Sequence, residues 1–326
     1  MRNETLAGQE TPSAIDVRVN EGAIAVPRPR PRYLNPHKMA PTVLVAPAVV
    51  IFLVVGIMPL LYSLYISVTN WVLTIPLPAK FVGLANYAQT FQDAELLKSL
   101  AVTAIYLTVT VGLEFGLGLA IALVAFNTMR GLSLIRVGLL IPMALPPIVV
   151  GLTWRLIYSP VGPLNWLLSL LGLHEVVWLG NRASALPAVM AVDIWQWTPF
   201  MFLLLYAGLL SLPSEVLEAA AVDGAGLLLR LRYIILPLLQ PVIAIALIFR
   251  LIDAIKTFDI AYILTGGGPA NATELISLYV FKVGLNFFHM GYASAVSYLL
   301  VVLTTVLSLV VFRFLDPISK TRGAGA

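Results

Sequence analysis

Glu218-Ala219-Ala220-Ala221-Val222-Asp223-Gly224 is a polar stretch between two long apolar runs of the chain. A loop between membrane spans needs little more than a turn, and this one carries the signals of a helix. Ser214 is placed to cap that helix, and Glu215 would lie in its first turn, where a carboxylate meets the positive end of the helix dipole. A second short helix is expected to follow, with Arg230 and Arg232 holding its end at a membrane surface.

The first of these helices should present a small apolar face. Leu217, Ala220 and Ala221 recur at helical spacing, which suits close docking against another surface. Gly224 and Gly226 are expected to end the helix, because glycine readily adopts the left-handed geometry of a helix C-terminus. An amphipathic helix lying on the bilayer is the alternative.

The spacing of residues continues beyond the helix as a longer pattern. It reads Glu-Ala-Ala, three residues, Gly, nine residues, Ile, one residue and Leu-Pro, and it runs without a gap from Glu218 to Pro237. At these residues the chain resembles the permease subunit of ATP-binding cassette (ABC) importers. In that family the loop, here about 211–232, carries a coupling helix that fits a cleft on a separate ATPase subunit. The resemblance assigns this contact to five residues: Glu218, Ala219, Ala220, Asp223 and Gly224.

Composition places the chain in a membrane. Hydrophobic residues make up 60% of the 326 residues and charged residues 11%, which a soluble core could not accommodate. The sequence has no cysteine and three scattered histidines, so we expect no disulfide and no metal site. The net charge of +4 is spread over loops without interleaved aromatic residues, so no nucleic-acid partner is expected.

Six long apolar runs predict an all-α, six-span membrane protein, and the resemblance implies the type I ABC importer permease fold. We expect a cytoplasmic tail over 1–40 with no cleavable signal peptide, a permease domain over 41–315 and a cytoplasmic tail over 316–326. The predicted spans are about 41–69, 100–126, 134–157, 185–210, 233 onward and 290–314.

Three prolines near the middle of the third span, Pro142, Pro146 and Pro147, should break its helix. The break would either line a pathway or only kink the helix for packing.

Basic residues indicate the orientation of these spans. With both termini inside, thirteen of the 20 basic residues fall on the cytoplasmic side and four in outer loops, as the positive-inside rule requires. The coupling loop is therefore predicted to lie in the cytoplasm, and the resemblance implies a bacterial inner membrane as the location.

Two further features lie in the first half of the chain. The segment Phe81–Tyr87 contains Gly-Leu-Ala-Asn-Tyr, which resembles an element that follows the first span in the carbohydrate branch of these permeases; an ordinary exposed turn is the alternative. In the second span, the four-residue interval between Gly112 and Gly116 predicts close approach of another helix. Glu114 lies near the middle of that span, and we favour a structural partner for it over contact with substrate.

No signature of an enzyme occurs in the sequence. The phosphate-binding pattern Gly-x-x-x-x-Gly-Lys-Ser/Thr is missing, as are a nucleophile elbow and a zinc-binding His-Glu pair. We therefore expect no catalytic residues and no cofactor in this chain, with ATP bound by a partner subunit.

Polar residues at matching depth on the two spans that flank the coupling loop suggest a substrate site. Asp193, Trp197 and Phe200 are spaced four and three residues apart, so they share one helix face. At about 1.5 Å per residue, Trp197 and Arg250 would both lie roughly 20 to 24 Å from the inner surface and could meet across one cavity.

The following span carries a matching set. Arg250, Asp253 and Thr257 are spaced three and four residues apart. An aromatic face beside hydrogen-bonding groups suits a sugar, and in the carbohydrate permeases that the chain resembles, substrate contacts come from these two helices. The alternative is that Arg250, Asp253, Lys256 and Asp259 neutralise one another or pair with a neighbouring helix.

The resemblance implies a permease that moves a sugar or sugar-like solute into the cytoplasm. Its implied partners are an ATPase dimer, a second similar permease chain, an extracytoplasmic solute-binding protein, the carbohydrate substrate and membrane lipids. The solute itself stays open among disaccharides, polyols and glycerol phosphates. One alternative function is an ion-coupled secondary transporter with Glu114 and Asp193 as ion sites; a non-transporting membrane scaffold is the other.

Overall fold

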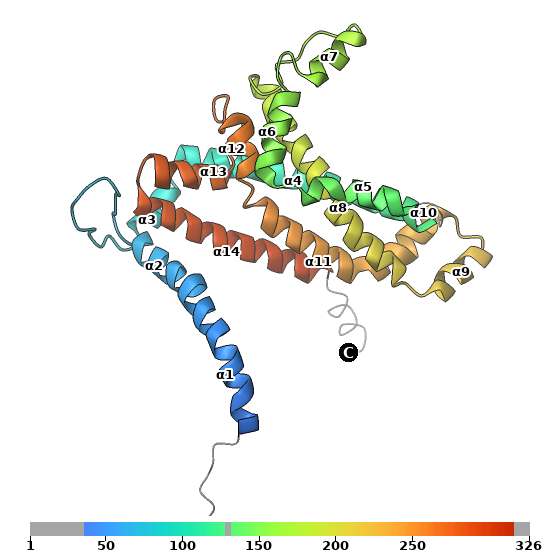
Figure 1. Ribbon diagram of the computed structural model, residues 1–326, viewed down its shortest axis with the longest axis horizontal. Helices are drawn as coiled ribbons and strands as arrows, with labels where there is room; N and C mark the ends of the chain where they lie inside the picture. Colours follow the sequence, from blue (N-terminus) through green and yellow to red (C-terminus); the bar gives the residue numbers. More distant parts are fainter. Residues whose placement is uncertain (1–35, 128–131, 316–326) are drawn as a thin grey trace, which may run out of the picture. The chain divides into compact units, whose positions relative to one another are not determined.

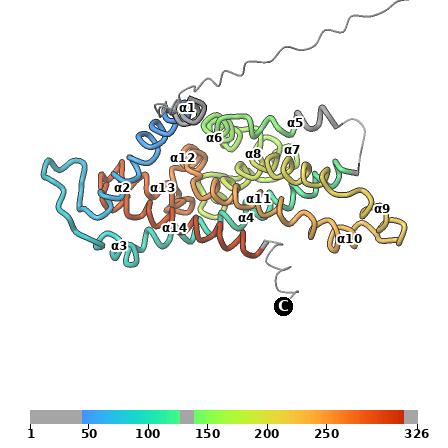
Figure 2. Tube along the Cα trace, turned by 90° about the horizontal axis from the view of Figure 1, so that it is seen from below, coloured from blue at the N-terminus to red at the C-terminus, as the bar shows by residue number. Residues whose placement is uncertain are grey.

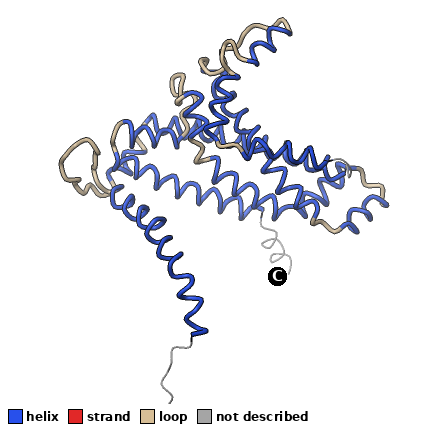
Figure 3. The backbone as a smooth tube through the Cα atoms, in the orientation of Figure 1, coloured by secondary structure: helices blue, strands red, loops and turns tan. Residues whose placement is uncertain are grey.

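The computed structural model describes residues 36–127 and 132–315, and every regular element within them is a helix (Figures 1 and 3). An isolated bridge between Thr69 and Phe81 is the one strand-like pairing in that part of the chain. The predicted all-α class is thereby confirmed. Residues 1–35 and 316–326, which cover most of both expected tails, lie outside the described residues.

The chain divides into two compact units, Met1–Ile57 and Met58–Ala326. In the first unit, α1 (Pro36–Ile51) leads into the π-helical segment η1 (Phe52–Ile57). The second unit holds the following helices: α2 (Met58–Ser67), α3 (Ala85–Thr90), α4 (Ala94–Asn127), α5 (Leu132–Ala144), α6 (Pro147–Ile157), α7 (Pro163–Leu170), α8 (Arg182–Leu210), α9 (Ser214–Val222), α10 (Leu227–Arg230), π-helical η2 (Leu231–Ile235), α11 (Leu236–Ala254), α12 (Asp259–Thr265), α13 (Ile276–Phe281), π-helical η3 (Lys282–Asn286) and α14 (Met290–Leu315).

Five helical stretches of the described chain are long and apolar enough to cross a membrane, and α5 with α6 makes a sixth if the pair counts as one span. This agrees with the six predicted spans, and the boundaries differ by a few residues. The five stretches are Leu44–Ser67, Ala94–Phe126, Arg182–Leu210, Leu227–Ala254 and Met290–Phe314.

The helices α4 and α8 form the most extensive pair of the second unit, and α11 packs against both. Gly118 of α4 makes the close approach possible: a Cβ atom there would lie 2.7 Å from the Cβ of Met201 and 2.9 Å from the backbone nitrogen of Phe202. The prediction for Gly112 and Gly116 was wrong within the described chain, since a Cβ at either position would meet no atom within 4 Å. The buried face of α4 runs through Glu114 and Gly118, and the other two glycines lie beside it.

The third span is broken, as its prolines predicted. The helices α5 and α6 meet at an angle of 106°. Pro146 precedes α6 and Pro147 is its first residue, a position where the missing backbone N–H is not needed. At the break, the side chain of Gln196 on α8 donates a hydrogen bond of 3.1 Å to the carbonyl of Leu145. A neighbouring helix thus satisfies a backbone group that the break exposes.

Span five is shorter at its outer end than the charge pattern predicted. The helix α11 ends at Ala254 and α12 begins at Asp259, so Thr257 lies in the turn between them and not on a continuous helix face. The turn returns the chain onto α6, against which α12 packs. After Gly266, which ends α12 in the left-handed conformation, α13 and η3 lead to α14, and α14 lies along α11 (Figure 1).

Candidate functional site

The guanidinium of Arg250 on α11 is surrounded by three carboxylates from α4, α8 and α11. Its Nε and Nη2 donate to the two oxygens of Glu114 at 2.6 and 2.9 Å, Nη2 also donates to Asp193, and Nη1 donates to Asp253 at 3.0 Å. Arg250 is 1% exposed, and Glu114 and Asp193 are fully buried. The structural partner expected for Glu114 is therefore Arg250.

Such a cluster joins three helices because each charge is stable only in the presence of the others. An ionised group inside a span is costly unless it is paired, and removing one partner leaves the remaining charge buried without compensation. Arginine suits the position since its planar fork of donors can bind several carboxylates at once. For Arg250, the sequence left two interpretations open: contact with substrate, or pairing with a neighbouring helix. The structure shows the pairing with neighbouring helices.

Trp197 covers the same cluster. The guanidinium carbon of Arg250 lies 5.2 Å from the centre of the Trp197 ring, a cation–π distance. Phe200 packs edge-on against Trp197 with ring centres 6.2 Å apart. Trp197 and Arg250, from the two spans that flank the coupling loop, therefore meet at one depth, as their spacing predicted.

A small hollow of about 100 Å³ opens beside Trp197. Four of the candidate substrate residues line it: Asp193, Trp197, Asp253 and Thr257. Arg250 and Phe200 do not line it, and both contact the ring of Trp197. The side chain of Asp253 is 51% exposed, so it keeps an accessible oxygen although it also pairs with Arg250.

Sequence reasoning did not assign several residues of the hollow to the site. Lys256 and Asp259 were seen only as part of a charge pattern, Pro147 only as part of a helix break, and Phe258 was not considered. All four come from the ends of α6, α11 and α12, where the chain turns. The proline break at 146–147 was the available signal, since it frees the start of α6 to face another span.

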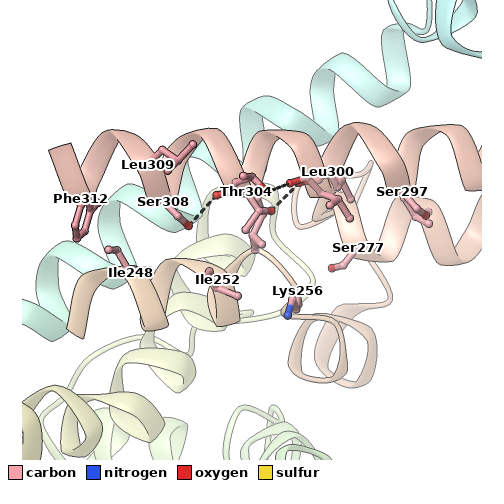
Figure 4. Close-up of a pocket in the computed structure, with 14 residues that line it drawn as sticks. Ile248, Ile252, Lys256, Ser277, Ser297, Leu300, Thr304, Ser308, Leu309 and Phe312 are labelled. Atoms are coloured by element: carbon pink, nitrogen blue, oxygen red, sulfur yellow. Dashed lines mark hydrogen bonds between the residues drawn. The ribbon is translucent and has the colours of Figure 1, made fainter. Parts of the chain in front are cut away.

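A larger groove of about 780 Å³ runs between α11 and α14 (Figure 4). Lys256 and Ser277 lie toward one end of it and Phe312 at the other. The hydroxyls of Thr304 and Ser308 donate to carbonyls one turn earlier on α14, at 2.7 and 2.8 Å, so they are already satisfied. Lys256 lines both this groove and the hollow beside Trp197.

The coupling loop forms the predicted helix, α9, with one correction at each end. Pro213 precedes α9 and no side chain caps it, so Ser214 is its first residue and not its cap. At the other end, the backbone N–H of Gly224 donates to Ala221 at 3.1 Å and that of Ala225 to Ala220 at 2.9 Å. This is a Schellman ending, with Gly224 in the left-handed region at φ +78°.

Gly226 does not end α9, because it precedes α10 at φ −64°. The second helix is also not separate: α10 continues through η2 into α11 as the stretch Leu227–Ala254. Within α9 no residue is buried, and Val222 at its end is 88% exposed. The helix therefore projects from the described part of the chain with its side chains accessible.

A family model described as the binding-protein-dependent transport system inner membrane component matches residues 115–321, which include Asp193, Arg250, Asp253 and the coupling loop. The chain belongs to this family. It is thus a multi-pass permease subunit of an ABC importer, a membrane component that works with a solute-binding protein, and the expected family is confirmed.

Curated relatives of the permease cover most of its length. The trehalose/maltose transport system permease protein MalF of Thermococcus litoralis is 43% identical over 275 residues, covering 83% of this chain and 92% of that protein. The trehalose transport system permease protein SugA of Mycobacterium tuberculosis is 38% identical over 257 residues, covering 79% and 82%. The sn-glycerol-3-phosphate transport system permease protein UgpA of Agrobacterium fabrum is 34% identical over 284 residues, covering 86% and 96%.

The fold of the permease also matches a solved structure. A chain of a bacterial ABC transporter involved in the import of the acidic polysaccharide alginate superposes with a TM-score of 0.75 at 20% identity, covering 86% of this chain and 96% of that one. This likeness confirms the expected type I importer permease fold.

Proposed function

We propose that this permease moves a carbohydrate or carbohydrate-like solute through its spans, and that ATP hydrolysis on a separate ATPase subunit drives the movement. The observation that carries the proposal is the hollow beside Trp197, where groups from three helical segments meet. The names of the relatives, which refer to trehalose, maltose and sn-glycerol-3-phosphate transport, agree with it.

The hollow combines the groups that a sugar requires. The ring of Trp197 offers an apolar face for C–H groups, and the exposed carboxylate of Asp253 accepts hydrogen bonds from hydroxyls. Thr257 and Lys256 add a hydroxyl and an ammonium group at the rim. Asp193 lines the hollow, while Arg250 and Phe200 contact the ring of Trp197 from outside it and hold that ring in position.

The coupling role belongs to α9 and its glycine ending. Glu218, Ala219, Asp223 and Gly224 are exposed and Ala220 is half-buried, so an ATPase subunit can reach all of them. Because α10 continues into α11, a displacement of α9 acts on the helix that carries Arg250 and Asp253.

The positive-inside distribution supports a cytoplasmic position for α9 and for both termini. The ATPase dimer then binds on this side, and the solute-binding protein delivers its cargo at the opposite face. A second, similar permease chain completes the pathway in this proposal.

Paired tryptophan variants test the substrate site. Trp195 lies two residues from Trp197, but it is 41% exposed and packs on Trp154 at a ring distance of 5.5 Å. We expect Trp197→Ala to lower uptake of the solute into proteoliposomes by at least about tenfold, since a lost aromatic contact and its ordering are worth about 1.4 kcal/mol or more. ATPase subunits should still co-purify with the variant.

Trp195→Ala should leave uptake within about twofold of the unchanged transporter. Equal uptake by both variants would remove the hollow from the pathway. Loss of ATPase co-purification in Trp197→Ala would instead assign Trp197 to packing alone.

A further inference from the structure

A second polar cavity, of about 400 Å³, shares no lining residue with the hollow beside Trp197. It is formed by the segment after α2, by α3, by the α13–η3 pair and by the start of α14. In Figures 1 and 2 these elements lie at the end of the unit Met58–Ala326 opposite to α9. With α9 in the cytoplasm, this cavity faces the side from which solute arrives.

The walls of the cavity are fastened by backbone hydrogen bonds. The N–H of Gly291 donates to the carbonyl of Trp71 at 3.0 Å, and the N–H of Leu73 donates to that of Phe288 at 2.9 Å. A Cβ at position 291 would collide with the carbonyl of Thr69, so glycine is needed there for the segments to meet. The entrance segment after α2 is therefore held against the start of α14.

Asn86, from the Gly-Leu-Ala-Asn-Tyr element noted in the sequence, fixes the opposite wall. Its buried amide donates two hydrogen bonds of 2.8 Å, to the carbonyls of Ser67 and Thr69. The hydroxyl of the next residue, Tyr87, lies 2.7 Å from the hydroxyl of Ser67. The element is thus no ordinary exposed turn, since it ties α3 to the end of α2 and shapes the cavity.

Asp93 closes the floor of the cavity and has no free charge to offer a ligand. Its carboxylate accepts hydrogen bonds from the hydroxyls of Tyr279 at 2.5 Å and Tyr292 at 2.7 Å, and from the backbone N–H groups of Glu95 and Leu96 at 3.0 and 3.1 Å. Burial alone would raise the pKa of Asp93, and these hydrogen bonds outweigh it and lower that pKa below its ordinary value. Burial and the same carboxylate raise the pKa of Tyr279 well above its ordinary value.

Other side chains on the cavity wall keep their hydrogen-bonding capacity. Those of Trp71, Gln89 and His289 make no hydrogen bond to another described residue, and Gln89 and His289 are exposed. Phe287, 62% exposed, adds apolar surface. Among residues 36–127 and 132–315, no lysine or arginine lines the cavity, so these residues offer no basic group to neutralise a phosphate or carboxylate ligand.

We propose that this cavity is an outer binding site for a neutral sugar, with Trp71 and Phe287 packing on the ring and Gln89 and His289 hydrogen-bonding its hydroxyls. The proposal rests on the proposed function as a carbohydrate permease and adds a first station for the solute. Preformed walls favour this reading, because binding then requires little ordering of the protein.

The outer cavity also has a neighbour toward the pathway. Tyr279 of α13 lines the cavity, while the next residue, Val280, lines the groove between α11 and α14. The groove in turn shares Lys256 with the hollow beside Trp197. The helix α13 therefore borders both the outer cavity and the groove.

Saturation-transfer NMR on the assembled transporter in nanodiscs, without nucleotide or binding protein, tests the outer site directly. The probes are four neutral disaccharides, maltose, trehalose, sucrose and lactose, with glycerol 3-phosphate as the anionic comparison. All variants carry Trp197→Ala, which removes the aromatic face of the central hollow. We expect transfer to at least one disaccharide, reduced at least fivefold when Gln89→Leu and His289→Leu are added.

Matched controls are Gln92→Leu and His174→Leu, since both residues are exposed and neither lines the cavity. Saturation transfer to these two control variants that equals transfer to the Trp197→Ala parent supports the proposal. The outer site is refuted by no transfer to any disaccharide, by equal transfer with and without Gln89 and His289, or by stronger transfer to glycerol 3-phosphate. Melting temperatures of the variants confirm that folding is intact, and Gln89→Glu replaces Gln89→Leu if that variant is unstable.

Uptake by the unchanged transporter separates this proposal from the proposed function. Sugar uptake without any signal at the outer cavity overturns the outer site alone. A signal that depends on Gln89 and His289, in a transporter that takes up no carbohydrate, supports the outer site as a sugar site and overturns the transport function.

Discussion

Arg250 is the residue on which the packing of α4, α8 and α11 depends. It is buried to 1% exposure and holds two fully buried carboxylates, Glu114 and Asp193, on the neighbouring helices. Its bond to Asp253 differs, because the side chain of Asp253 is 51% exposed and water can replace the interaction. One guanidinium thus makes two kinds of ion pair with different energetic weight.

Replacing Arg250 by glutamine should therefore destabilise the permease strongly. The change leaves Glu114 and Asp193 buried without a positive partner, which costs about 3–5 kcal/mol in comparable cases. The measurement is the thermal or denaturant unfolding of the purified transporter in detergent.

The control is Asp253→Asn, which removes only the exposed partner and should cost less than about 1 kcal/mol. Equal losses in the two variants would show that the buried carboxylates are stable without Arg250.

At the scale of helices, glycines determine where two spans come into close contact. Gly118 permits the crossing of α4 and α8, and Gly208 permits that of α8 and α11, where a Cβ would lie 2.8 Å from Leu239. Gly151 does the same between α6 and α12, with Ile263 at 3.1 Å. At Gly118 the added Cβ would meet backbone, whereas at Gly208 and Gly151 it would meet side chains that can shift, so Gly118 is the most restrictive of the three positions.

Gly118→Val should accordingly displace α8 from α4. The side chain would enter space held by the backbone of Phe202, and overpacking of this kind costs about 1–3 kcal/mol or more. Gly116→Ala is the matched change on the same helix, and it meets no described atom within 4 Å.

We expect the Gly116→Ala transporter to melt at or above the temperature of the unchanged one, because alanine is the better helix former. A similar loss of stability in both variants would contradict the assigned crossing.

The ending of α9 permits a comparison between two glycines in one loop. Gly224 has φ +78° and Gly226 has φ −64°. A Cβ atom added at either position would meet no described atom within 4 Å. Gly224→Val should therefore disrupt the Schellman ending through backbone strain alone, at about 1–3 kcal/mol, and reduce co-purification of the ATPase subunit. Gly226→Ala should leave co-purification unchanged, and a loss in both variants would show that the loop needs space and not the left-handed turn.

The elements show which parts of the fold can be predicted from sequence and which cannot. Apolar runs and prolines predicted the spans and the break before Pro147, because hydrophobic length and a missing N–H act locally. The choice of Gly118 over Gly112 and Gly116 could not be predicted, since it depends on which face of α4 meets α8. The turn at Thr257 was missed for the same reason: its position is fixed by the contact of α12 with α6.

The candidate site also has one part that the sequence could predict and one that it could not. The spacing of Trp197 and Arg250 predicted that the two residues lie at the same depth, and the guanidinium of Arg250 does lie over the ring of Trp197. Spacing could not reveal that Arg250 is committed to Glu114, because the partner lies 136 residues away on another helix. Charge sign alone does not distinguish a group that binds substrate from one that binds a helix.

Along the unit Met58–Ala326, α9 lies at one end and the elements that form the outer cavity lie at the opposite end (Figures 1 and 2). The Arg250 cluster joins α4, α8 and α11, which run between these ends. In the proposed function, energy and solute therefore enter at opposite ends, and transport requires that a movement at α9 reaches the hollow beside Trp197.

Glu218→Lys should interrupt that connection without disturbing the spans. The residue is exposed on α9, so the reversed charge should weaken the fit to the ATPase and lower ATP-driven uptake at least about tenfold while the melting temperature of the permease stays the same. Glu215→Lys on the same helix, outside the Glu-Ala-Ala pattern, should cost only the dipole interaction, about 0.3–1 kcal/mol, and keep uptake near that of the unchanged transporter. Full uptake by the Glu218→Lys transporter, or uptake without any ATPase subunit, would refute the assigned coupling role.

The position of one guanidinium also bears on the mechanics of the transport cycle. Because α10, η2 and α11 form one continuous helical stretch, we expect a displacement at its Leu227 end to reach Arg250. The ion pairs of Arg250 with the buried Glu114 and Asp193 would pass this displacement on to α4 and α8. We therefore expect the three helices to rotate together as one rigid body rather than to slide past one another.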